Sequence, residues 1–75
     1  MTKKEIIKAI EETANTLNNG EYTIEETLTE NLISNEEEGV IVEKDINGNI
    51  YTFIDNNSVY PTKYSPEEFA TIYAN

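Results

Sequence analysis

The sequence predicts a single α+β domain over residues 1–75, with an N-terminal helix, a three- or four-stranded antiparallel sheet and a short C-terminal helix. Three patterns support this fold class: apolar residues at helical spacing near the start, two β-branched runs around an Asn-Gly turn, and a proline-led helix start near the end. A chain of 75 residues encloses only one core. Because the chain has neither cysteine nor histidine, packing alone must hold the fold, without disulfides or a structural zinc site.

The first element is a helix predicted over roughly residues 2–18. Thr2 and Glu5 have the spacing of a capping box, in which each side chain accepts a hydrogen bond from a free backbone donor at a helix start. Asn18-Asn19-Gly20 is expected to end the helix, because glycine adopts the left-handed conformation found at helix C-termini. The apolar stripe of this helix consists of Ile6, Ile7, Ile10, Ala14 and Leu17.

Residues 21–35 fit two interpretations. Apolar residues recur at spacings of two or four, which agrees equally with a strand and with one face of a helix. Thr23 and Glu26 even form a second potential capping box. Three β-branched threonines favour the pleated backbone, so extended structure is expected here. The apolar residues in question are Tyr22, Ile24, Leu28 and Leu32.

A β-hairpin is predicted over residues 39–55, turning at Asn47-Gly48. A two-residue turn would set Val42 opposite Phe53, whereas a type I turn with a bulge would set Ile41 opposite Phe53. Apolar residues fall on both faces in either register, so we expect the hairpin to lie centrally in the sheet with a helix over one side.

After the hairpin, a bend is expected at residues 55–58, followed by a short edge strand through Val59 and Tyr60 that Pro61 stops. The closing helix starts at Ser65-Pro66, where serine caps and proline suits the first helical position. Glu68 completes a capping box. The apolar face expected on this helix comprises Phe69, Ile72 and Tyr73.

Composition restricts the function. Five lysines stand against thirteen glutamates and two aspartates, the net charge is −10, and there is no arginine. A field of that sign repels nucleic acid, so direct DNA or RNA binding is not expected. No apolar run is long enough to span a membrane and no signal peptide is recognisable, which indicates a cytoplasmic protein. Ten asparagines and ten isoleucines are typical of a low-GC bacterium or its phage.

Catalysis and metal binding are not expected either, and no cofactor is predicted. Histidine and cysteine are missing, and the sequence contains no nucleophile or phosphate-loop motif. Adjacent carboxylates such as Glu11-Glu12 point in different directions on a helix or strand, which favours a solvated surface. The segment beginning at Asp45 differs from a calcium loop, because its glycine is fourth rather than sixth and position twelve is Asn56.

The distribution of charge is the informative feature. Residues 1–10 carry a net charge of +2, so the remaining residues carry −12. Between Lys8 and Lys44 there are ten glutamates and no cation. One interpretation is solubility, since a run of like charge is usually a solvated face. The other is imitation of nucleic acid, because a domain of this size spans roughly 30 Å, over which one DNA strand presents about nine phosphates.

The second interpretation predicts a contact surface made mainly of glutamates from residues 21–43. Tyr60 and Tyr64 flank Pro61 in a predicted loop and join this surface, because tyrosine combines a large apolar ring with a polar tip. The predicted partner-binding residues are Glu21, Glu25, Glu26, Glu30, Glu36, Glu37, Glu38, Glu43, Tyr60 and Tyr64.

Three segments carry a resemblance to a known class of protein: the opening Thr2-Lys3-Lys4-Glu5-Ile6-Ile7, the Val40–Ile54 hairpin, and the closing Ser65-Pro66-Glu67-Glu68-Phe69. In layout the chain resembles small phage-encoded anti-CRISPR proteins that occupy the PAM-reading site of Cas9. In size and acidity it is similar to uracil-DNA glycosylase inhibitors. The resemblance implies a non-enzymatic DNA mimic whose partner is a basic, nucleic-acid-binding protein such as Cas9 or a DNA-repair enzyme. The alternative is a small cytoplasmic interaction domain of a low-GC bacterium whose acidity serves solubility only.

Overall fold

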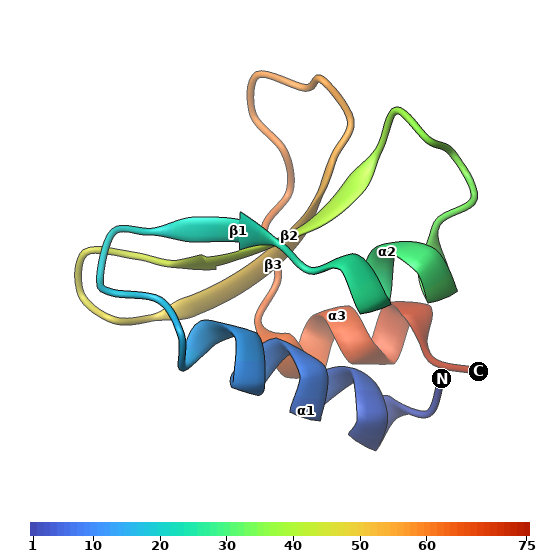
Figure 1. Cartoon of the computed structure of the whole chain (residues 1–75), viewed down its shortest axis with the longest axis horizontal. Coiled ribbons are helices and arrows are strands. Elements are labelled where there is room, and N and C mark those ends of the chain that lie inside the picture. Colours follow the sequence, from blue (N-terminus) through green and yellow to red (C-terminus); the bar gives the residue numbers. More distant parts are fainter.

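The computed structural model describes residues 1–75 and confirms the α+β class, with one helix more than predicted. Helices α1 and α3 lie side by side under one face of a three-stranded antiparallel sheet of order β1-β2-β3, and the two chain ends meet (Figure 1). The domain measures 30 × 28 × 18 Å, and none of its helices is long and apolar enough to cross a membrane. The elements in chain order are α1 (Lys3–Ala14), β1 (Tyr22–Ile24), α2 (Glu26–Leu32), β2 (Gly39–Lys44), β3 (Ile50–Asp55) and α3 (Pro66–Tyr73).

One hydrophobic core joins the helices to the sheet. Two valines of the central strand, Val40 and Val42, are fully buried on the face that α1 and α3 cover. Because side chains alternate along a strand, Ile41 points to the opposite face, beside Ile24 and Phe53 of the neighbouring strands. Helices α1 and α3 cover one face of the sheet, as expected, but the hairpin as a whole is not central, because β2 is the middle strand and β3 is an edge strand. The core residues are Ile6, Ile10, Ala14, Leu28, Val40, Val42, Phe69 and Ala70.

Helix α1 begins as predicted but ends four residues early. Its capping box is present, with the Thr2 hydroxyl accepting from Glu5 N and the Glu5 carboxylate accepting from Thr2 N. The predicted end at Asn18-Asn19-Gly20 is wrong: the helix stops at Ala14, and tighter turns follow. Gly20 does have a positive φ of 87°, but it serves the entry to β1, where its N–H donates to the carbonyl of Lys44 at 2.8 Å.

The expectation of extended structure over residues 21–35 holds only for β1, because α2 follows directly. The Glu25 carboxylate caps this helix by accepting from Leu28 N at 2.7 Å, so the cap is not Thr23. Thr29 explains why a β-branched residue is stable here. Its hydroxyl donates to Glu25 O at 3.0 Å and accepts from Val40 N at 2.9 Å, which ties α2 to the central strand.

The hairpin adopts the bulged register, with Ile41 opposite Phe53. Gly48 N donates to Asp45 O at 2.9 Å and Gly48 has a φ of 87°, as a type I turn with a glycine bulge requires. The predicted edge strand through Val59 and Tyr60 is wrong, because the chain bends at both residues and no strand includes them. Tyr64 instead forms a β-bridge with Thr52, through N···O distances of 2.7 and 2.9 Å.

Helix α3 begins as the sequence predicts. Ser65 and Glu68 form the capping box and Pro66 is the first helical residue. The expected apolar face needs one correction, because Ile72 is 54% exposed and Ala70 takes its place in the core beside Phe69.

Thr52 supplies a test of the core. Its side chain is fully buried and its hydroxyl has no hydrogen-bond partner, which costs free energy because the group has lost water. Thr52→Val keeps the shape and removes the hydroxyl, so we expect the free energy of unfolding to rise by about 1 kcal/mol. Urea unfolding followed by circular dichroism measures this change. Thr52→Ser, which keeps the hydroxyl, should be less stable than the parent; a valine variant that is no more stable would contradict the account.

The hairpin turn gives a pH-dependent prediction. Hydrogen bonds from the backbone of Asn49 are the main cause that lowers the pKa of Asp45 below its ordinary value of 3.8. Because the folded pKa is depressed, this stabilisation is complete above pH 3.8 and is lost as the pH falls through the folded pKa. Asp45→Asn should therefore melt at a lower temperature than the parent at neutral pH, and the gap should close in acid. A gap that stayed constant from pH 7 to about pH 2 would rule out this role.

Candidate binding site

The structure places the predicted glutamates in two regions of the domain (Figure 1). Glu21 precedes β1 and Glu43 lies across from Tyr22, both toward the hairpin-turn end of the sheet. The other region is α2 with the loop that leaves it. We call five of its residues the acidic end: Glu26, Glu30, Glu36, Glu37 and Glu38.

Carboxylates of the acidic end have no cationic partner. The molecule contains two salt bridges: an exposed Lys8–Glu12 pair at 3.9 Å and a Lys63–Glu43 pair at 2.9 Å. Neither involves the acidic end. Asn35 shapes the loop, since its side-chain oxygen accepts from Glu37 N at 3.0 Å and its carbonyl accepts from Glu38 N at 3.1 Å. A side chain that forms an Asx turn therefore sets the backbone from which these loop carboxylates project.

The remaining three predicted glutamates serve the fold. Glu25 caps α2, and the Glu21 carboxylate accepts from Asn18 N at 2.6 Å. Glu43 binds Lys63, whose ammonium lies 5.3 Å from the centre of the Phe53 ring. A partner would have to compete with these contacts, so the acidic end is the part of the predicted surface that is free to bind.

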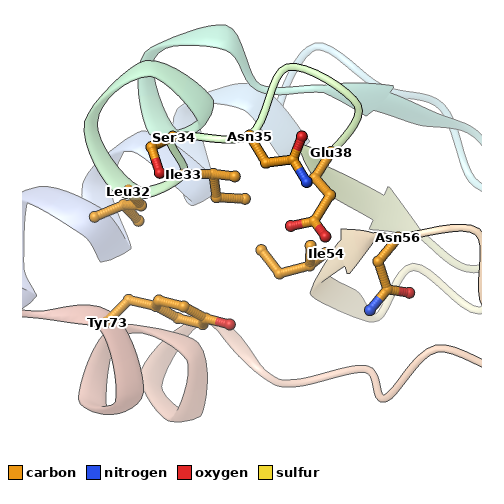
Figure 2. A pocket seen from close by; sticks show the side chains of 8 residues that line it. All are labelled: Leu32, Ile33, Ser34, Asn35, Glu38, Ile54, Asn56 and Tyr73. Carbon is orange, nitrogen blue, oxygen red and sulfur yellow. The ribbon is translucent and has the colours of Figure 1, made fainter.

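A groove adjoins the acidic end and has two lobes. The first lobe, of about 370 Å³, lies between the end of α2, the loop to β2, strand β3 and helix α3. Figure 2 shows the Glu38 carboxylate and the Tyr73 hydroxyl pointing toward the middle of this lobe, near Ile54. Its lining residues are Leu32, Ile33, Ser34, Asn35, Glu38, Ile54, Asn56 and Tyr73.

The second lobe, of about 250 Å³, continues the groove under the segment after β3 and shares Ile54, Asn56 and Tyr73 with the first. The two predicted tyrosines both line it but differ in setting. Tyr60 is 91% exposed, whereas Tyr64 is half-buried, paired with Thr52 and packed against the core. Of the predicted residues, Glu38 therefore lines the first lobe, and Tyr60 and Tyr64 line the second.

Tyr73 is a groove residue that the sequence assigned only to the core face of the last helix. Its ring packs on Phe69 of the same helix, with ring centres 4.5 Å apart and planes tilted by 32°. Burial raises the pKa of Tyr73 above 10.0, and the nearby Tyr64 and Glu38 raise it further. The phenol is thus a protonated hydroxyl at neutral pH and can donate a hydrogen bond. No local pattern marks Tyr73, Ile54 or Asn56, because the groove forms only when β3, α2 and α3 meet.

The groove offers hydrogen-bonding groups and one carboxylate beside apolar side chains. Nowhere in the chain do three or more acidic side chains gather in an arrangement that could hold a metal ion. Such a lining suits recognition of a ligand that has both an apolar part and a positive or hydrogen-bond-donating group.

The unpaired charges of the acidic end predict a response to salt. Raising sodium chloride from about 0.01 M to about 0.1 M shortens the Debye length from about 30 Å to about 10 Å. Screening weakens the mutual repulsion of the carboxylates, so we expect the melting temperature to rise by about 4 °C. Thermal scans by circular dichroism measure this. A variant with glutamine at Glu26, Glu30, Glu36 and Glu37 should respond less, and an unchanged melting temperature of the parent would show that repulsion is negligible.

Comparisons with known proteins were made for the whole chain. No protein-family model, no curated protein and no solved structure matches it. The proposals below therefore rest on the residues and the geometry of this chain.

Proposed function

We propose that this protein is a non-catalytic inhibitor that occupies the cationic groove of a nucleic-acid-binding protein, with the acidic end as its main contact surface. The candidate partners are those that the sequence resemblance suggests, Cas9 with its guide RNA and a DNA-repair enzyme such as uracil-DNA glycosylase. Both kinds of enzyme act where DNA is handled, so we expect the protein to act in the cytoplasm of a bacterial cell.

One observation carries this proposal: five carboxylates belong to α2 and the loop that leaves it, within a domain 30 Å long, and no lysine lies within 4.0 Å of any of them. A surface on which positive and negative side chains alternate would have relieved the repulsion between these carboxylates at little cost. Lysine and arginine side chains in the partner's groove would supply the missing cations. Long-range attraction would also steer the two proteins together, because complementary fields raise association rates.

The competing explanation is that acidity serves solubility alone. In that case the position of the carboxylates is immaterial and only their number matters. In the mimicry proposal the position decides binding. Two variants that lose the same charge from different places therefore distinguish the explanations.

The test is competition against a fluorescent DNA duplex bound to guide-loaded Cas9 or to uracil-DNA glycosylase, measured by anisotropy. We expect excess protein to displace DNA from one of these partners, and its affinity to fall steeply as salt rises. Removing four charges from the acidic end should weaken inhibition at least tenfold, roughly 1.4 kcal/mol. The variant carries Glu26→Gln, Glu30→Gln, Glu36→Gln and Glu37→Gln.

A matched control removes three exposed carboxylates elsewhere and should inhibit like the parent. If both variants lost inhibition equally, net charge rather than a specific surface would be responsible. If DNA stayed bound to both partners in the presence of excess parent protein, mimicry of their substrates would be wrong. The control variant carries Glu11→Gln, Glu12→Gln and Glu67→Gln, on α1 and α3, and the acidic-end variant matched to it carries Glu26→Gln, Glu30→Gln and Glu36→Gln.

A further inference from the structure

The first lobe of the groove holds a carboxylate that nothing in the chain neutralises. Glu38 is half-buried, its side chain accepts no hydrogen bond, and no cation lies within 4.0 Å of it. Because Glu38 is half-buried, its carboxylate is partly shielded from water, and charges interact more strongly where water is partly excluded. A positively charged group is the natural complement of this carboxylate.

Half of the residues that line the same lobe are apolar or aromatic, and the other half are polar. Leu32, Ile33 and Ile54 supply aliphatic surface, and Tyr73 supplies a ring held in place by Phe69. With a volume of about 370 Å³, the lobe lies near the lower end of the range of ligand pockets, roughly 300 to 1,000 Å³. That size suits one long side chain or a small molecule rather than a folded surface.

We propose that the first lobe binds the guanidinium group of an arginine presented by another molecule, with Glu38 as its ion-pair partner and the Tyr73 ring beside its plane. Guanidinium is planar and always charged, pairs with carboxylate through two hydrogen bonds, and packs on aromatic rings. The aliphatic part of the arginine lies against the apolar walls. This inference deepens the proposed function and depends on it for its biological meaning, since grooves that bind nucleic acid are rich in arginine.

Other occupants fit the lobe less well. An anion would meet Glu38 and the field of a chain with net charge −10. A divalent metal would find a single carboxylate, because no acidic cluster lies there. A second copy of the chain cannot supply the ligand, since the sequence contains no arginine. The guanidinium must therefore come from a different molecule.

The experiment titrates N-acetyl-arginine amide into the ¹⁵N-labelled protein and follows backbone amide shifts by NMR. We expect saturable shifts at Ile54, Asn56 and Tyr73, with a dissociation constant in the millimolar range. The citrulline derivative, which has the same shape and no charge, should bind at least tenfold more weakly. Glu38→Gln should weaken arginine binding at least tenfold and leave the rest of the spectrum unchanged, whereas Glu67→Gln, a matched change on α3, should have no effect.

The ring contribution has its own variants. Tyr73→Leu should weaken binding severalfold, and Tyr73→Phe should restore most of it, because phenylalanine keeps the ring and its packing on Phe69. Shifts that do not saturate, equal binding of the citrulline derivative, or unchanged affinity in Glu38→Gln would each overturn the inference. Tighter binding of the lysine derivative would also overturn it, since the site would then select an ammonium group. Arginine binding without inhibition of any DNA-binding partner would support this site and contradict the proposed function, so the two failures are distinguishable.

Discussion

Packing of Val40 and Val42 against α1 and α3 is the contact on which the rest of the structure depends. Strand β2 lies between β1 and β3, and it also receives the Thr29 hydroxyl bond from α2. Every element is therefore attached to it directly or through one neighbour. A core this small rarely supplies more than about 3 to 5 kcal/mol, and the unpaired carboxylates oppose it. The capping interactions at all three helix starts add stability that does not draw on the core.

The groove is built from the same contacts as the fold. Phe69 in the core fixes the ring of Tyr73, and the β-bridge between Thr52 and Tyr64 returns the chain to β3 after residues 56–63. Asn35 sets the turn that presents Glu38. Each wall is thus anchored by an interaction with a structural role of its own. A groove of this kind is preorganised, which reduces the conformational entropy lost when a ligand binds.

Local signals in the sequence predict local structure well. The capping boxes at Thr2 and Ser65 locate two helix starts. Gly48 marks the hairpin turn, and of the two registers proposed for it the bulged one is correct. Helix α2 was not predicted, because apolar spacings of two and four agree with a strand as well as with a helix. The hydrogen bond from Val40 N of β2 to the Thr29 hydroxyl is a tertiary contact that favours the helix. The groove could not be predicted from the sequence either, because tertiary contacts form it. Its walls come from segments up to 41 residues apart, Leu32 to Tyr73, whose meeting no local pattern encodes.

The outer strands of the sheet have consequences for behaviour in crowded solution. Strand β1 is an edge only three residues long, and glutamates stand immediately before and after it. The far side of β3 is partly occupied by the backbone of Tyr64. A strand from another copy would meet the glutamates that flank β1 at one edge of the sheet. At the other edge, backbone groups of β3 are already hydrogen-bonded to Tyr64. Both features oppose edge-to-edge aggregation of the sheet, even though aromatic side chains such as Tyr22 are exposed to water.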